Sequence, residues 1–144
     1  MMTKKILLAE DDEDDRFLFY DFIKERTDIV LQHSTENGME ILDYLDQIPE
    51  ASSFPDLIVL DQNMPKMNGY QTLYSLKSNN RYTDIPVAIY TTYSDKRLMK
   101  ECYDAGALVV IEKPISPSGY HQMMNEFIKL ISKEIESDQN KIPS

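Results

Sequence analysis

The sequence has little positive charge, few glycines, a single cysteine and no long hydrophobic run. Its 144 residues include 15 Lys and Arg against 25 Asp and Glu, a formal net charge of −10. This balance argues against binding to a nucleic-acid backbone, which proteins contact through Lys and Arg. No apolar run exceeds five residues, so we expect neither a membrane-spanning helix nor a signal peptide.

The scarce residue types also limit the chemistry. Cys102 cannot form an intramolecular disulfide, which fits a reducing, cytoplasmic compartment. Neither histidine is close to it in sequence, so we interpret Cys102 as a small buried residue on a helix and not as a nucleophile. The four glycines form no cluster that could cradle a phosphate, which disfavours a nucleotide-binding domain.

Five short apolar runs recur along the chain and predict buried strands. They are rich in β-branched residues and lack polar alternation, as is typical of strands covered on both faces. The runs are Ile6–Ala9, Ile29–Leu31, Leu57–Leu60, Val87–Tyr90 and Val109–Ile111. Amphipathic helical segments lie between them, so we predict an α/β, flavodoxin-like, doubly wound fold. Its five parallel strands have the order 2-1-3-4-5, with five helices.

Several residues predict where helices begin and end. Ser94 and Ser116 are typical N-cap residues, and Pro117 suits a first helical turn. Gly106 follows the fourth helix, where a left-handed C-cap is favoured. The segments 47–55 and 77–86 are rich in Pro, Ser and Asn and predict loops.

Polar side chains follow four of the predicted strands. Glu10 and Asp11 directly follow the first strand, Asp61 the third and Thr91 the fourth, and Lys113 comes two residues after the fifth. In the predicted order the first, third, fourth and fifth strands are neighbours, and their carboxyl ends share one edge of the sheet, where open α/β sheets bind ligands. The sequence therefore predicts that three carboxylates, a hydroxyl and an ammonium group meet there.

Three carboxylates and one lysine leave this site negatively charged, because like charges in a low-dielectric environment repel strongly. A hard divalent cation would offset the repulsion, and Mg²⁺ prefers oxygen ligands of this kind. Such a cation, together with an ammonium group, would also stabilise a phosphoryl group carried on a carboxylate. We therefore predict Mg²⁺ as the cofactor.

Simpler roles are open for some of these residues. Asp12 to Asp15 would favour a helix dipole by standing at a helix N-terminus. Asp61 could be a turn former, and Lys113 could be a solvated surface lysine.

The ordered motifs of the chain resemble the receiver domain of two-component response regulators. The resemblance runs from about Lys4 to Lys133 and is carried by ILLAEDDEDD, PDLIVLDQNMPKMNG, PVAIYTT and GALVVIEKP. It is strongest to stand-alone, single-domain receivers, so we expect no output domain. On this basis residues 1–133 are expected to form the receiver domain and residues 134–144 a polar C-terminal tail.

The resemblance implies a role for each residue at the sheet edge. Asp61 matches the phosphoacceptor, Glu10 and Asp11 match the Mg²⁺-binding acidic pair, and Asn63 matches the residue whose main-chain carbonyl also binds the metal. Thr91 matches the switch hydroxyl.

Lys113 matches the lysine that pairs with phosphate oxygens, and its bond to Pro114 is expected to be cis. The chain departs from the family at Val110, where Tyr or Phe is usual, and either Tyr90 or Tyr93 could replace that ring.

The resemblance further implies a sensor histidine kinase or a histidine phosphotransfer protein as phosphodonor, and a downstream protein target. A homodimer through the face between the fourth strand and the fifth helix is possible. Residues 16–23 carry more large apolar side chains than one buried stripe requires, which predicts either a docking patch or a wider contact with the core that leaves some rings exposed. Two alternatives are a receiver-like adaptor that works without phosphorylation and an aspartyl-phosphate phosphatase. The latter would place an acid where Asn63 stands.

Overall fold

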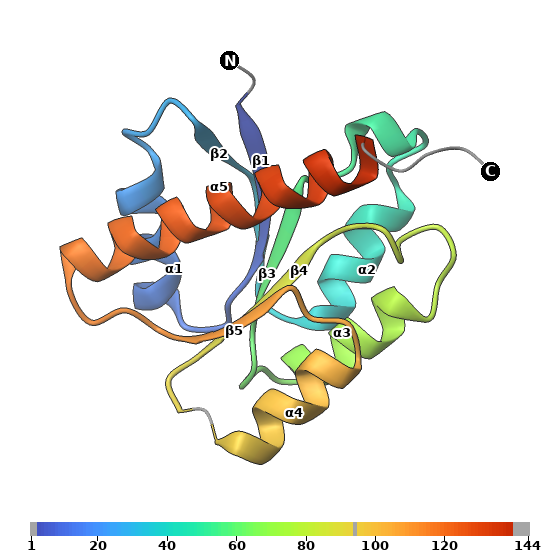
Figure 1. Cartoon of the computed structure of the whole chain (residues 1–144). Coiled ribbons are helices and arrows are strands. Elements are labelled where there is room, and N and C mark those ends of the chain that lie inside the picture. Colours follow the sequence, from blue (N-terminus) through green and yellow to red (C-terminus); the bar gives the residue numbers. More distant parts are fainter. Residues whose placement is uncertain (1–2, 94, 140–144) are drawn as a thin grey trace.

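Five parallel strands form the central sheet of the computed structural model, which describes residues 3–93 and 95–139 (Figure 1). The strands are β1 (Lys4–Ala9), β2 (Ile29–Thr35), β3 (Leu57–Asp61), β4 (Val87–Thr91) and β5 (Val109–Glu112). Their order is β2-β1-β3-β4-β5, with every adjacent pair parallel. The predicted flavodoxin-like order is confirmed.

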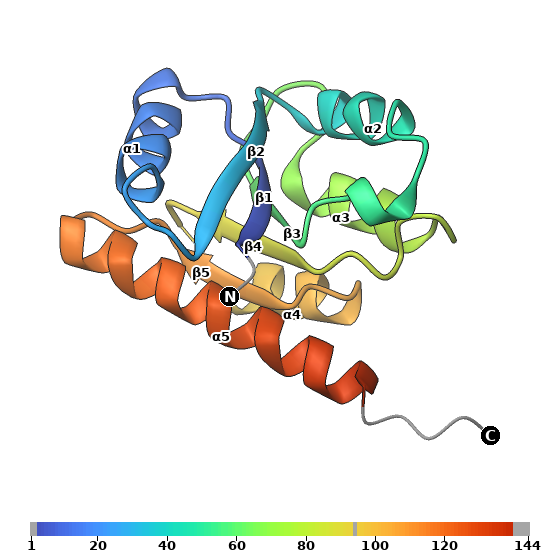
Figure 2. The same cartoon turned by 90° about the horizontal axis from the view of Figure 1, so that it is seen from above.

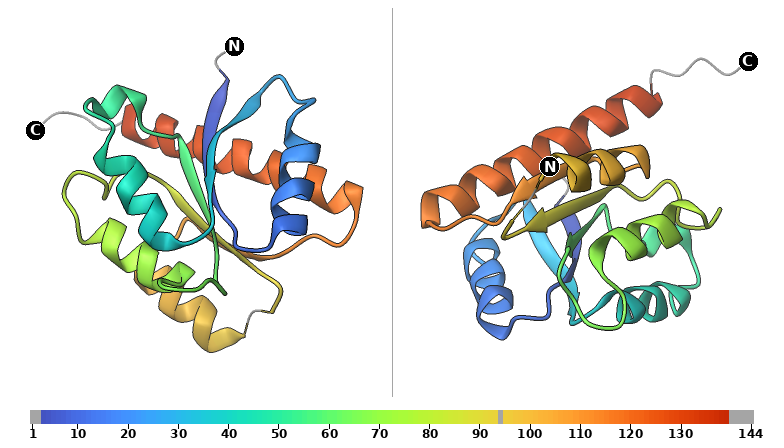
Figure 3. Two further views of the ribbon diagram at one scale, coloured as in Figure 1. Left: turned by 180° about the vertical axis from the view of Figure 1, so that it is seen from behind. Right: turned by 90° about the horizontal axis from the view of Figure 1, so that it is seen from below.

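Helices cover both faces of the sheet (Figure 2). They are α1 (Glu13–Ile23), α2 (Gly38–Asp46), α3 (Gly69–Lys77), α4 (Lys96–Asp104) and α5 (Pro117–Gln139), with a 3₁₀ turn at Ala51–Ser53. Buried side chains of α1 and α5 pack against one face, and those of α2, α3 and α4 against the other (Figure 3). Helix α5 includes residues 134–139 of the predicted tail, whereas residues 140–144 lie outside the described part of the chain.

Burial explains why the prediction for β3 was accurate to one residue. Every residue of β3 is buried, because β3 has a strand on each side and a helical layer on each face. The edge strand β2 runs four residues beyond the predicted Leu31. Its added residues, Gln32 to Thr35, are all polar, which an edge strand with one hydrogen-bonded neighbour accommodates.

The helix boundaries agree with most of the predicted caps. The Ser116 hydroxyl accepts a hydrogen bond from the Gly119 N–H at 3.1 Å, and α5 begins at Pro117. Gly106 has a φ of 106°, as a left-handed C-cap requires. The predicted cap Ser94 lies outside the described residues, and Asp95 caps α4 by accepting from the Leu98 N–H at 2.7 Å.

One backbone expectation is wrong. No peptide bond among the described residues is cis, so the Lys113–Pro114 bond is trans. The trans form is the more stable one even for a bond to proline, by roughly 0.5–1 kcal/mol. None of the described helices is long and apolar enough to cross a membrane.

Candidate functional site

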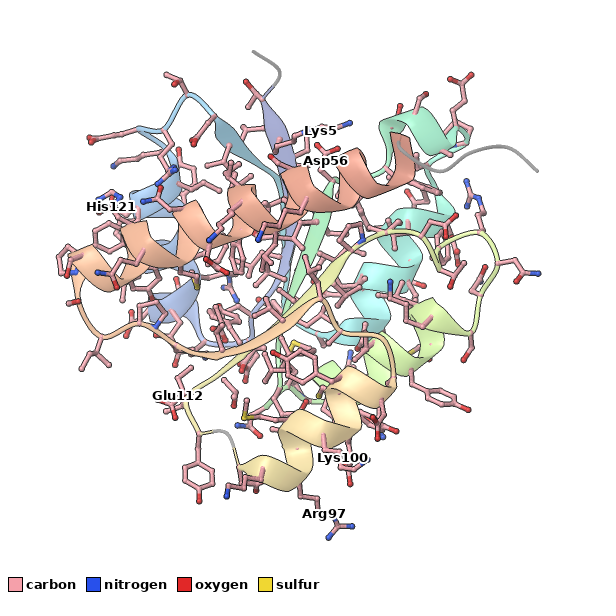
Figure 4. All side chains as sticks on the ribbon, in the orientation of Figure 1. Lys5, Asp56, Arg97, Lys100, Glu112 and His121 are labelled. Atoms are coloured by element: carbon pink, nitrogen blue, oxygen red, sulfur yellow. The ribbon has the colours of Figure 1, made fainter. Side chains whose placement is uncertain are left out.

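The carboxyl ends of β1, β3, β4 and β5 lie along one edge of the sheet. Figure 4 labels Glu112 near this edge, whereas Lys5 and Asp56 mark the opposite edge. Glu10 follows β1, and its N–H donates to the Thr35 carbonyl of β2 at 2.9 Å. Asp61 is the last residue of β3 and Thr91 the last of β4. The parallel sheet therefore delivers residues far apart in sequence to one place.

Three carboxylates meet at this edge, as predicted. Glu10, Asp11 and Asp61 each offer an oxygen, and these oxygens lie within 4.8 Å of one another. Glu10 is fully buried and Asp61 is 2% exposed, while Asp11 faces solvent. With two buried acids beside an exposed one, the cluster is accessible to a cation from the solvent side.

Lys113 brings the ammonium group into the same cluster. Its Nζ lies 2.7 Å from Glu10 Oε1 and 3.3 Å from Asp61 Oδ2, and its side chain is only 11% exposed. The Lys113 N–H donates to the Thr91 carbonyl at 2.9 Å, which fixes where the side chain begins. Lys113 is therefore part of the site and not a solvated surface lysine.

Asp15 is a site residue that the sequence analysis missed. Its Oδ2 lies 3.0 Å from Lys113 Nζ, although we had expected it only to favour a helix dipole. No local pattern signals this contact, because Asp15 lies on α1 and Lys113 follows β5, 98 positions away. Asp12 has the simpler role predicted for it, since its side chain caps α1 by accepting from the Asp15 N–H at 2.9 Å.

The crowding of acids changes their protonation. Burial, a hydrogen bond with Glu10 and the charge of Glu10 raise the pKa of Asp61 from 3.8 to about 8, although the charge of Lys113 opposes the shift. Burial alone would lower the pKa of Lys113, but its hydrogen bonds to Glu10 and Asp15 raise it. The raised pKa of Asp61 reflects a negative charge on the crowded acids that one lysine does not offset. This donor set fits a hard divalent cation.

Thr91 and Asn63 are placed beside the cluster. The Thr91 hydroxyl is buried and donates to the Tyr93 carbonyl at 3.0 Å. The Asn63 N–H donates to Asp61 Oδ1 at 3.3 Å, so the backbone after β3 orients the central acid. To donate to a phosphoryl group on Asp61, the Thr91 hydroxyl would have to give up its hydrogen bond to the Tyr93 carbonyl.

A glycine fixes the turn that carries Asp61. The Gly69 N–H donates to the Gln62 carbonyl at 3.1 Å as α3 begins. A Cβ atom at Gly69 would lie 2.6 Å from the Asp61 carbonyl oxygen, closer than side chains ever approach backbone. Gly69 therefore allows α3 to start directly against the end of β3.

The position of the usual family aromatic is occupied by a small buried side chain. Val110 is 6% exposed and packs in the layer of α2, α3 and α4, while its N–H donates to the Tyr103 hydroxyl at 3.0 Å. Tyr93 is 74% exposed, whereas Tyr90 is fully buried beside Glu10. Of the two possible replacement rings, only Tyr90 is packed against the acid cluster.

Removing the Lys113 ammonium group should lower the stability of the metal-free protein without lowering its affinity for Mg²⁺. We expect Lys113→Ala to destabilise the metal-free protein by about 3 kcal/mol, because its loss leaves buried carboxylates unpaired. Mg²⁺ affinity should be retained, since the substitution removes no oxygen ligand. Chemical denaturation with and without Mg²⁺ measures both effects, and Lys96→Ala at an exposed lysine is the matched control. Loss of Mg²⁺ binding in a folded Lys113→Ala protein would contradict the assignment.

Comparison with known proteins identifies a family that the chain resembles over most of its length. A family model described as the response regulator receiver domain matches residues 6–125. The polar-differentiation response regulator DivK of Brucella ovis is 28% identical over 127 residues, which are 88% of this chain and 98% of DivK. A protein-glutamate methylesterase/protein-glutamine glutaminase of Clostridium acetobutylicum is 31% identical over 142 residues. This chain spans only 39% of the length of that relative.

Solved structures show the same fold. The phosphorylated cyanobacterial phytochrome response regulator RcpA matches with a TM-score of 0.74 and 30% identity, over 99% of this chain and 100% of that one. The Mn²⁺-bound form of the response regulator Rcp1 matches with a TM-score of 0.71 and 29% identity, over 83% of this chain and 88% of that one.

Proposed function

The chain belongs to the response regulator receiver domain family, and on this premise we propose that it is a phosphorylation-dependent signalling switch. Asp61 accepts a phosphoryl group from a histidine kinase or a histidine phosphotransfer protein, and the modified protein changes its binding to a downstream protein. The observation that carries this proposal is the meeting of Glu10, Asp11, Asp61 and Lys113 at one sheet edge.

The transfer requires one bond exchange. A carboxylate oxygen of Asp61 forms a bond to phosphorus while the bond between phosphorus and the donor nitrogen breaks, and the electron pair of that bond leaves with the donor. Stabilising the transition state requires mainly positioning and charge stabilisation. The protein therefore needs no general acid beside the acceptor Asp61. Asn63, two residues after Asp61, supplies none, which disfavours the phosphatase alternative.

The residues at the site have different roles in binding the metal and the phosphoryl group. Glu10, Asp11, Asp61 and the Asn63 main-chain carbonyl would hold Mg²⁺, which when bound offsets negative charge on the transferred group. Lys113 moves its ammonium from the carboxylates to a phosphoryl oxygen. Thr91 releases the Tyr93 carbonyl and donates its hydroxyl to the same group.

The exposed side of α1 supplies a docking surface for the phosphodonor. Phe17, Leu18 and Tyr20 are 64%, 39% and 49% exposed, whereas Phe19 and Ile23 are buried. This apolar surface begins at Phe17, one turn into α1, and α1 itself begins two residues after Asp11. Its position would bring a bound donor close to Asp61.

The proposal is tested by direct phosphorylation. With Mg²⁺ and acetyl phosphate, intact-protein mass spectrometry should show the gain of a single phosphoryl group, and hydroxylamine, which attacks acyl phosphates, should remove it. A metal chelator should prevent the gain. An unchanged mass in saturating Mg²⁺ would favour the adaptor that works without phosphorylation.

A further inference from the structure

Tyr90 is a buried tyrosine whose hydroxyl reaches into the acid cluster. It lies in β4, opposite Asp61 in the strand register, and its hydroxyl donates to Glu10 Oε1 at 2.6 Å. Both side chains are fully buried. The hydroxyl therefore contacts the acid at a place where no solvent could replace it, and charge-assisted bonds of this length are strong.

Besides its hydrogen bond with Asp61, the Glu10 carboxylate has three donors among the described residues, and these donors differ in how many other groups they contact. Oε1 accepts from Tyr90 and from Lys113 at 2.7 Å, and Oε2 accepts from the Asp12 N–H at 3.2 Å. Lys113 is shared with Asp15 and Asp61. If Lys113 moves to a phosphoryl oxygen, Tyr90 becomes the one side chain among these donors that still holds Oε1.

The Tyr90 ring is itself fixed by its surroundings. Phe19 of α1 meets it edge to face, with ring centroids 5.9 Å apart and planes at 72°. Lys113 Nζ lies 5.1 Å from its centroid on the way to the carboxylates.

We propose that Tyr90 is a positioning residue for the metal site, whose hydroxyl orients the Glu10 carboxylate toward the cation. The inference rests on the proposed function, because it assumes that Glu10 takes part in Mg²⁺ binding. Partners of a metal ligand fix its orientation, and removing one typically weakens metal affinity tenfold or more. A ring that merely filled the core would work equally well without its oxygen.

Tyr90→Phe tests this proposal because it keeps the ring and removes only the hydroxyl. We expect about tenfold weaker Mg²⁺ binding by titration calorimetry, with an unchanged far-ultraviolet circular dichroism spectrum. Tyr93→Phe, on an exposed ring in the same segment, should bind Mg²⁺ as the wild type does. Mg²⁺ should also perturb tyrosine absorbance in the wild type, and this difference spectrum should diminish in Tyr90→Phe.

Repeating Tyr90→Phe in a Glu10→Asp protein tests whether the effect depends on the hydrogen bond between Tyr90 and Glu10. Glu10→Asp shortens the acid by one methylene, so its carboxylate no longer reaches the Tyr90 hydroxyl. In that background Tyr90→Phe should cost less than about twofold in Mg²⁺ affinity, because coupled residues are non-additive. An equal loss in both backgrounds, or wild-type affinity in Tyr90→Phe alone, overturns the positioning role. Absence of Mg²⁺ binding by the wild type would instead overturn the proposed function and this inference with it.

Discussion

Asp61→Asn is expected to abolish phosphoryl incorporation from acetyl phosphate. The substitution keeps the shape of the side chain but replaces the nucleophilic oxygen with an amide, which forms no stable bond to phosphorus. Intact-protein mass spectrometry under the conditions that label the wild type should show the unmodified mass alone. Because Asn has the shape of Asp and removes a charge that is crowded by Glu10, the variant should retain its fold.

Two further variants determine what this loss means. Asp43→Asn, at an exposed acid of α2, should label like the wild type. Asp11→Asn keeps the acceptor but removes one oxygen of the acid cluster, so it should label slowly at low Mg²⁺ and recover at high Mg²⁺. Labelling of Asp61→Asn at the wild-type level would show that another side chain is the acceptor.

The metal-free protein should become less stable as the pH rises from about 4 to about 8. The pKa of Asp61 is raised to about 8 in the folded state and is 3.8 without the fold, so the folded state holds a proton that the unfolded chain releases across this window. Each pH unit within it costs up to about 1.4 kcal/mol. We expect a loss of roughly 2–4 kcal/mol between pH 5 and pH 8, because neighbouring acids share the proton.

Urea denaturation at several pH values, with a chelator present, measures this slope. In Asp61→Asn the slope should flatten, since no carboxylate is left there to ionise. Saturating Mg²⁺ should restore the wild type at pH 8, and Mg²⁺ affinity should increase with pH because the metal competes with the proton. If the stability of the metal-free wild type did not change with pH between about 4 and 8, crowding by Glu10 would not raise the pKa of Asp61.

The sequence predicted the strands and their order because their physical signal is local and strong. A run such as Leu57–Leu60, apolar without alternation, has few alternatives to a buried strand. Asp61 directly after it was then placed by topology alone. The end of β2 was missed, since an edge strand tolerates the polar residues Gln32 to Ser34 that resemble a loop in sequence.

The site residues that end or follow strands were predictable from the sequence. Side-chain contacts between elements far apart in the chain were less so. Glu10, Asp61 and Lys113 follow strands directly and came together as expected. Asp15 reaches Lys113 from a helix, a contact between residues 98 positions apart that no local pattern specifies. Likewise, nothing in the segment around Tyr90 indicates that its hydroxyl finds Glu10, 80 positions away.

Helix α4 is attached to the domain much more lightly than the strand that carries Asp61. Cys102 is its one buried residue among those described, whereas all five residues of β3 are buried and β3 is hydrogen-bonded on both edges. Displacing β3 would break two hydrogen-bonded ladders, whereas displacing α4 would break neither and would uncover Cys102 and the partly buried Leu98 and Met99. Amide hydrogens of α4 should therefore exchange through local opening at far lower free energy than those of β3. The surface best able to respond to a change at Asp61 is thus the helix that follows Thr91.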